Sequence, residues 1–120
     1  MRMKRVLIAE DNDSNYILMT YILKNHYEFE RAVDGQQAVD MAMTGRFDLV
    51  LMDIKMPGMD GLEATKQIKE KNPDLPVIAL TANAFDSDRQ MAIDAGCVEF
   101  LTKPISSQIC LATIAKFVGE

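Results

Sequence analysis

The sequence predicts a single α/β domain, in which helices cover both faces of a doubly wound parallel sheet. Short apolar runs typical of strands alternate five times with segments whose apolar residues recur at helical spacing. Such alternation implies parallel strands joined by right-handed helical crossovers. A length of 120 residues suits one domain with one core, and no linker, repeat or low-complexity tract divides the chain. We therefore expect one domain over residues 1–120.

The predicted strands differ in how deeply the sheet buries them. The third strand ends in Asp53 and is apolar from Leu49 to Met52, which is typical of a central parallel strand. The second strand is more polar and is expected at or near a sheet edge, where Asp34 and Gly35 turn the chain. The five strands are predicted at residues 5–9, 28–33, 49–53, 76–81 and 98–101.

The predicted helices are bounded by capping residues, glycine or proline. Asp13 or Ser14 is expected to cap the first helix, because short polar side chains accept hydrogen bonds from free helical N–H groups. In the polar fourth helix, only Met91, Ala92 and Ala95 are expected to face the core. The helices are predicted at residues 14–25, 38–43, 62–69, 87–94 and 108–118.

Composition and charge exclude several classes of function. The net charge of −5 argues against nucleic-acid binding by this chain alone, because the phosphate backbone attracts basic surfaces. No apolar stretch is long enough to span a membrane, and the apolar run after the basic start is too short for a signal peptide. Cys97 and Cys110 have neither redox nor zinc-ligand spacing and are expected to be reduced, partly buried thiols. We expect a cytoplasmic chain that makes no membrane contact of its own.

Polar side chains gather where the predicted strands end. Glu10 and Asp11 follow the first strand, Asp53 ends the third, Thr81 ends the fourth, and Lys103 follows the fifth. Ligands bind outside the carboxyl ends of parallel strands, so these side chains are expected to share one rim. Crowded carboxylates recruit a cation, and hard oxygen ligands suit Mg²⁺. The sequence therefore predicts a magnesium site.

The same groups suit phosphoryl transfer to a carboxylate. We expect Asp11 and Asp53 to bind Mg²⁺ directly and Glu10 to act through water. The backbone carbonyl of Lys55 would complete the protein's share of ligands. Asp53 can then attack phosphorus, while Lys103 and the strand-end threonine offset charge on the phosphoryl oxygens.

Five separated motifs span essentially the whole chain, namely Glu10-Asp11, Asp53, the run from Met56 to Gly61, Thr81-Ala82 and Lys103-Pro104. Together they resemble the receiver domains of two-component response regulators. The resemblance implies a flavodoxin-like fold with five strands in the order 2-1-3-4-5 and five helices. It also implies transfer of a phosphoryl group from a kinase phosphohistidine to Asp53. That transfer would require Mg²⁺, with Mn²⁺ able to substitute, and the peptide bond before Pro104 would be cis.

The resemblance further implies a switch that carries the signal outward. Thr81 would move to donate to the phosphoryl group and Phe100 would turn inward, shifting the population between two conformers. Lys55 and Asn83, two residues after Asp53 and Thr81, flank the path of the water that hydrolyses the acyl phosphate in this family. We expect slow self-dephosphorylation that these two side chains modulate.

Two contexts for such a domain stay open. The segments around Asn15, Ile54 and Asn83 resemble receivers built into hybrid sensor histidine kinases, so we expect the cytoplasmic receiver segment of such a kinase. A stand-alone response regulator is the alternative. In either context the expected partner is a histidine kinase phosphodonor domain or a histidine phosphotransfer protein.

A phosphatase with Asp11 as nucleophile is the rival class of function. Asp11 and Asp13 after a buried strand resemble the first motif of haloacid-dehalogenase-type phosphatases. The chain is short for such an enzyme, and no later acidic metal pair or cap segment is evident. The variants Asp11→Asn and Asp53→Asn would distinguish the phosphatase mechanism from that of a receiver.

Overall fold

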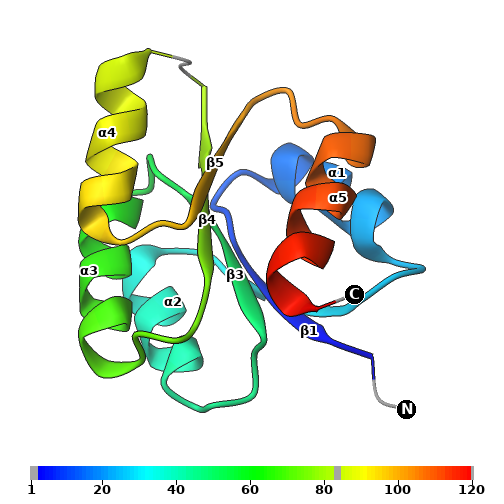
Figure 1. Ribbon diagram of the computed structural model, residues 1–120, viewed down its shortest axis with the longest axis horizontal. Coiled ribbons are helices and arrows are strands. Elements are labelled where there is room, and N and C mark those ends of the chain that lie inside the picture. Colours follow the sequence, from blue (N-terminus) through cyan, green and yellow to red (C-terminus); the bar gives the residue numbers. More distant parts are fainter. Residues whose placement is uncertain (1–2, 83–84, 120) are drawn as a thin grey trace.

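The computed structural model describes residues 3–82 and 85–119, which form a five-stranded sheet between two layers of helices (Figure 1). The strands are β1 (Arg5–Ala9), β2 (Glu28–Ala32), β3 (Leu49–Asp53), β4 (Val77–Thr81) and β5 (Glu99–Thr102). The helices are α1 (Asp13–Leu23), α2 (Gly35–Ala42), α3 (Gly61–Lys71), α4 (Asp86–Ala95) and α5 (Ser107–Val118). Neighbouring strands are parallel in the order β2-β1-β3-β4-β5. The predicted fold class and strand order are confirmed.

The sheet separates two hydrophobic cores because successive strand residues point to opposite faces. On β1, Val6 and Ile8 pack with side chains of α1 and α5, whereas Leu7 and Ala9 pack with side chains of α2, α3 and α4. Figure 1 shows the same division, with α1 and α5 on one face of the sheet and the other three helices opposite. Each fully buried Leu or Ile contributes about 1.5–3 kcal/mol to stability. These two cores hold the strand ends at one fixed edge.

The burial of the strands matches their predicted central and edge positions. Every residue of β3 and β4 is buried, while four of the five residues of the edge strand β2 are partly exposed. The exposed face of β2 carries ion pairs from Arg5 to Glu28 and Glu30 at 2.6 and 2.7 Å, and Arg46 reaches Glu30 at 2.7 Å. Among the described residues, no helix is long and apolar enough to cross a membrane.

The cap of α1 differs from the prediction. Asn12, and neither Asp13 nor Ser14, is the N-cap, because its side chain accepts from the N–H of Asn15 at 2.9 Å. Asn12 has the extended backbone that a cap requires, whereas Asp13 already lies in the first helical turn. The helix then ends at Leu23, two residues earlier than predicted.

Met91 was predicted to face the core, and this prediction is wrong. Ala92 and Ala95 of α4 are buried against the sheet, but Met91 is 52% exposed. Residues three apart share a helix face, so the buried stripe passes through the two alanines and leaves Met91 about 100° around the helix. Strand β5 also begins one residue later than predicted and runs through Thr102.

Candidate functional site

Three carboxylates converge at the carboxyl ends of β1 and β3. Glu10 and Asp11 follow β1 directly, and Asp53 is the last residue of β3. Each offers an oxygen atom, and these atoms all lie within 4.8 Å of one another. Glu10 is 1% exposed and Asp53 is 5% exposed, whereas Asp11 is exposed. Because β1 and β3 are neighbours in the sheet, the topology brings together residues that lie far apart in the chain.

Lys103 is in ion-pair contact with two of these carboxylates. Its Nζ lies 3.1 Å from Oε1 of Glu10 and 3.2 Å from Oδ1 of Asp53. Its backbone N–H donates to the carbonyl oxygen of Thr81 over 2.7 Å, and its peptide bond to Pro104 is cis. Lys103 therefore joins the end of β5 to the ends of β1, β3 and β4.

Backbone amides hold the same two carboxylates from the loop side. The N–H of Asn12 donates to Oε2 of Glu10 at 3.2 Å, and the N–H of Lys55 donates to Oδ1 of Asp53 at 3.3 Å. Lys55 thus has its backbone beside Asp53, as the predicted ligand role requires. Whether its carbonyl oxygen binds a metal stays a prediction.

The cluster carries more negative than positive charge, because three carboxylates face the ammonium of Lys103. Burial, followed by the hydrogen bond with Asp53, raises the pKa of Glu10 to about 7. Burial acts to lower the pKa of Lys103, but Glu10 and Asp53 outweigh burial and raise it. When all three carboxylates are ionised, one divalent cation would balance the remaining charge. The donor set of carboxylate oxygens therefore fits Mg²⁺.

A cavity of about 270 Å³ opens onto these groups. A water molecule takes about 30 Å³ in the liquid, so the cavity has room for a hydrated cation and a phosphoryl group. Its lining includes the predicted site residues Glu10, Asp11, Asp53, Lys55, Thr81 and Lys103. The structure thus brings these side chains to one edge of the sheet.

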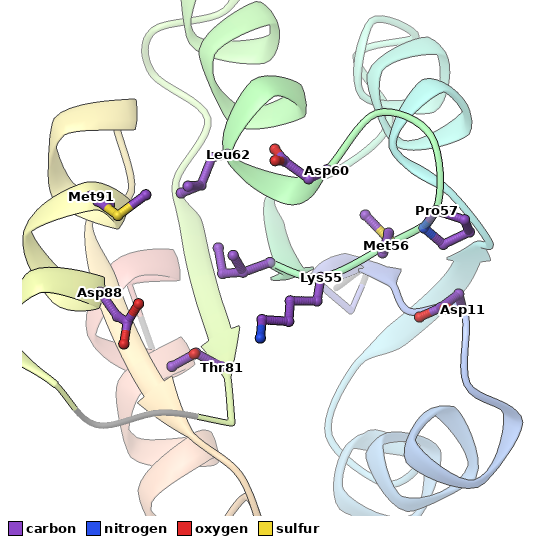
Figure 2. Close-up of a pocket in the computed structure, with 10 residues that line it drawn as sticks. Asp11, Lys55, Met56, Pro57, Asp60, Leu62, Thr81, Asp88 and Met91 are labelled. Carbon is purple, nitrogen blue, oxygen red and sulfur yellow. The ribbon is translucent and has the colours of Figure 1, made fainter.

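A second cavity of about 640 Å³ shares Asp11, Lys55 and Thr81 with the first (Figure 2). Figure 2 shows the Lys55 side chain reaching into it from the loop after β3, with Asp88 and Met91 contributed by α4. Sequence patterns miss these two α4 residues as lining residues, because α4 reaches the site only through the packing of the fold.

The loop between β3 and α3 closes back on Asp53 at Gly61. A Cβ on Gly61 would overlap the carbonyl oxygen of Asp53 and lie 2.8 Å from the Cα of Ile54. The N–H of Gly61 donates to the carbonyl oxygen of Ile54 at 2.9 Å. Only glycine permits this approach of backbone to backbone. No local sequence pattern indicates the contact, which involves residues eight positions apart.

Phe100 lies behind the site rather than in it. It is partly buried on β5 and packs against the core under α3 and α4. Phe100 pairs with Ala79, and Thr81 pairs with Thr102, so Phe100 and Thr81 share one face of the sheet. The predicted position of Asn83 lies outside the described residues.

Comparisons with known sequences agree with this geometry. Residues 6–115 match the family described as the response regulator receiver domain. Sensor protein GacS of Pseudomonas syringae pv. syringae is 39% identical over 124 residues, which cover 98% of this chain and 14% of GacS. Polar-differentiation response regulator DivK of Brucella anthropi is 38% identical over 120 residues, which cover 98% of each chain. The chain therefore spans only a small part of one relative and nearly all of the other.

Two solved structures share the fold closely. The receiver domain of sensor histidine kinase PA1611 from Pseudomonas aeruginosa, with a magnesium ion in its active-site cleft, matches with a TM-score of 0.91. The match has 33% identity and covers 98% of this chain and 99% of that one. A chain of the complex between the Saccharomyces cerevisiae phosphotransfer protein Ypd1 and the receiver domain of Ssk1 matches with a TM-score of 0.92. That match has 29% identity and covers 98% and 90% of the two chains.

The sheet order, the acidic rim and the family match over residues 6–115 agree with one another. We conclude that this chain belongs to the receiver domain family of two-component response regulators.

Proposed function

We propose that Asp53 accepts a phosphoryl group from a phosphohistidine in a Mg²⁺-dependent reaction, and that the acyl phosphate later hydrolyses slowly. The observation that carries the proposal is the position of Lys103, whose ammonium contacts Glu10 and Asp53 together. An ammonium at this position can neutralise the two carboxylates and can then contact the oxygens of an incoming phosphoryl group. The magnesium ion in the cleft of the related Pseudomonas aeruginosa receiver supports the metal requirement.

In the proposed transfer, a carboxylate oxygen of Asp53 bonds to phosphorus while the bond from phosphorus to the histidine nitrogen breaks. The electron pair of that bond leaves with the imidazole, which picks up a proton from solvent. A carboxylate is already ionised near neutral pH, so the nucleophile needs no general base. Catalysis then reduces to positioning and neutralisation of charge, which is the usual requirement of phosphoryl transfer.

The geometry of the site supports the following residue roles. Asp11 and Asp53 would bind Mg²⁺ directly, Glu10 would act through water, and the carbonyl oxygen of Lys55 would complete the set. When bound, the metal neutralises developing charge on the phosphoryl oxygens. Lys103 would turn its ammonium toward one of these oxygens, since it already lies 3.2 Å from Asp53.

Thr81 and Phe100 would carry the signal to the surface. The Thr81 hydroxyl would donate to the new phosphoryl group, and the end of β4 would move with it. Phe100 lies on the same face of the adjacent strand, so it would border the space vacated by Thr81. Lys55 and Asn83 would set how easily water reaches the acyl phosphate.

The exposed face of α1 is where we expect the histidine partner to dock. Ile17, Leu18 and Tyr21 are exposed on this helix, and Tyr21 is 67% exposed. Leu18 shares a small cavity with Glu10 and Lys103, so this apolar face borders the reacting groups. A partner that packed a helix here would bring its histidine to the same edge of the sheet. The yeast complex of a receiver with a phosphotransfer protein is consistent with such a partner.

For the parent protein, we propose a hybrid sensor histidine kinase that contains this chain as its receiver segment. The 39% identity to GacS supports this context. The similar identity to DivK keeps a stand-alone regulator as the alternative. An antibody against this domain separates the two in cell extracts, because a stand-alone protein would migrate near 13.5 kDa.

The direct test is incubation with phosphoramidate, whose phosphorus–nitrogen bond resembles that of phosphohistidine, with and without Mg²⁺. We expect the intact mass to increase by one phosphoryl group on Asp53 only when Mg²⁺ is present. Asp40→Asn on the exposed side of α2 is the matched control and should behave as wild type. A phosphoryl group that persists in Asp53→Asn and disappears in Asp11→Asn would instead support the phosphatase mechanism.

A further inference from the structure

Arg31 connects the edge strand β2 to the segment that carries the metal-binding carboxylates. Its Nε donates to the backbone carbonyl oxygen of Glu10 at 3.0 Å, and its Nη1 lies 2.9 Å from Oδ1 of Asp13. Its guanidinium carbon lies 4.6 Å from the centre of the Tyr16 ring. One side chain therefore contacts three residues of the β1–α1 segment, each by a different kind of interaction.

These contacts lie on both sides of Asp11. The carbonyl group of Glu10 belongs to the peptide unit that leads into Asp11, and Asp13 follows two residues later. The N–H of Glu10 also donates to the carbonyl oxygen of Ala32 at 3.0 Å, so β2 and its Arg31 hold both backbone groups of Glu10. The orientation of the peptide plane before Asp11 is thereby fixed from β2.

Asp11 depends on this backbone anchoring more than its neighbours do. Lys103 and backbone amides hold the carboxylates of Glu10 and Asp53 directly. Within residues 3–82 and 85–119, the exposed carboxylate of Asp11 has no such hydrogen-bond or ion-pair partner. Its position relative to Asp53 is therefore set mainly by the backbone of the β1–α1 segment.

The contacts of Arg31 are better suited to positioning than to stability. Asp13 is 85% exposed on its side chain, and exposed ion pairs contribute little to folding. By contrast, the hydrogen bond to a carbonyl group and the packing on a ring fix both the direction and the distance of the segment. A planar guanidinium can make all three contacts at once, which an ammonium cannot.

We infer that Arg31 is a positioning residue of the metal site, which holds the β1–α1 segment so that Asp11 presents its carboxylate beside Asp53. The inference rests on the proposed function, because it assumes that Asp11 is a ligand of Mg²⁺. It adds a residue from the edge strand that touches neither the metal nor the phosphoryl group.

The test measures the Mg²⁺ dissociation constant by isothermal titration calorimetry in wild type, Arg31→Gln, Arg31→Lys and Asp13→Asn. We expect Arg31→Gln to bind Mg²⁺ about tenfold more weakly, the usual loss when a residue that orients a metal ligand is removed. Arg31→Lys should be weakened by several-fold, since a compact ammonium cannot reproduce the three contacts of the planar guanidinium with Glu10, Asp13 and the Tyr16 ring. Asp13→Asn should remain near wild type, because the bond from Arg31 to Glu10 stays intact.

Arg46→Gln is the matched control. Arg46, like Arg31, forms an ion pair that involves β2, and it lies 2.7 Å from Glu30 of that strand. Arg46 precedes β3, so it lies at the amino end of the sheet, away from the rim. This variant loses a comparable ion pair and should keep wild-type affinity for Mg²⁺. Amide hydrogen exchange at residues 11–13 without metal should become faster in Arg31→Gln and stay unchanged in Arg46→Gln.

The outcomes distinguish the inference from the proposed function. Wild-type Mg²⁺ affinity in both Arg31 variants would overturn the positioning role and leave the proposed function standing. If wild type itself binds no Mg²⁺, or if Asp11→Asn binds it as well as wild type does, the proposed function fails and the inference fails with it. Should Arg31→Gln not fold, Arg31→Lys decides the matter by the same comparison.

Discussion

The Nζ of Lys103 lies 3.2 Å from Oδ1 of Asp53, although fifty residues separate them in the chain. The same nitrogen contacts Glu10 at 3.1 Å, so it screens two of the three carboxylates of the cluster from each other. In the proposed reaction, Lys103 would oppose metal binding in the free protein and would stabilise the phosphoryl group during transfer.

Replacing Lys103 with Met is therefore expected to change binding and chemistry in opposite directions. Mg²⁺ should bind more tightly, because the negative charge of the cluster is no longer offset. Phosphorylation by phosphoramidate should be about a hundredfold slower, as is typical when one group that stabilises transition-state charge is removed. Calorimetry and timed intact-mass measurements check the two effects. Lys66→Met on the exposed side of α3 is the control, and weaker Mg²⁺ binding in Lys103→Met would contradict the assigned role.

Gly61→Ala should impair the site through the backbone of Asp53. The added methyl group would overlap the carbonyl oxygen of Asp53, and relief of such overpacking costs about 1–3 kcal/mol. The displaced Asp53 should accept phosphoryl groups more slowly. Gly45→Ala is the comparison, because Gly45 has a φ of 77° and no atoms within 4 Å of a Cβ. It should lose stability through backbone strain and keep its phosphorylation rate, and equal phosphorylation rates in the two variants would refute the contact.

Glu30 should make stability depend on pH in the acid range. Its hydrogen bond with Arg46, together with that from Arg5, holds the pKa of its carboxyl below the ordinary value for a glutamate. A lowered native-state pKa stabilises the fold above the unfolded-state pKa, and this contribution is lost as the pH falls through the native value. Glu30→Gln should therefore lower the free energy of unfolding, measured by urea denaturation at pH 7, by less than about 1 kcal/mol, since the pair is partly exposed. The difference from wild type should shrink as the pH falls below the unfolded-state pKa and through the native-state pKa, and a constant difference over that range would show that charge is not its cause.

The two thiols should resist modification in the folded protein. Burial raises the pKa of Cys97 and of Cys110 to about 11, and Cys110 is fully buried. The thiolate is the reactive form, so a disulfide reagent at pH 8 should react slowly until denaturant is added. Two thiols should then react per chain. Rapid reaction of Cys110 under native conditions would contradict its burial on the side of α5 that packs into the core.

Thr81→Ala should separate phosphorylation from the response of Phe100. Wild type with Mg²⁺ and beryllofluoride, a mimic of the phosphoryl group, should show chemical-shift changes at Ala82 and at the Phe100 ring. In Thr81→Ala the mimic should still bind, but the Phe100 signals should stay near their free positions. Thr44→Ala, at an exposed hydroxyl after α2, is the control. Unchanged Phe100 signals in wild type would exclude the proposed switch.

The strand ends could be predicted because they depend on local pattern. The apolar run before Asp53 and the short run before Glu10 each end at a carboxylate, and the topology of a parallel sheet then brings those ends together. The strand order itself came from the resemblance to a family rather than from the residues alone.

Features set by tertiary contacts were not predictable from local pattern. Asn12 caps α1 because the helix begins at Asp13, one residue earlier than predicted. Several adjacent residues can act as caps, and only the backbone geometry decides among them. Arg31 appears ordinary in the sequence, since it lies in an edge strand. Gly61 ends one of the family motifs, but the sequence does not show which atoms it approaches. Their importance arises from contacts with Glu10 and Asp53 that the fold creates.

The hydrogen bond from the N–H of Lys103 to the carbonyl oxygen of Thr81 has a mechanical consequence. The two residues that would bind a phosphoryl group are joined by a main-chain hydrogen bond. A displacement of one would therefore move the other without any side chain between them. The ends of β4 and β5 would then move together when the acyl phosphate forms. Substitutions that weaken this hydrogen bond should leave phosphorylation intact and reduce the conformational change that follows it.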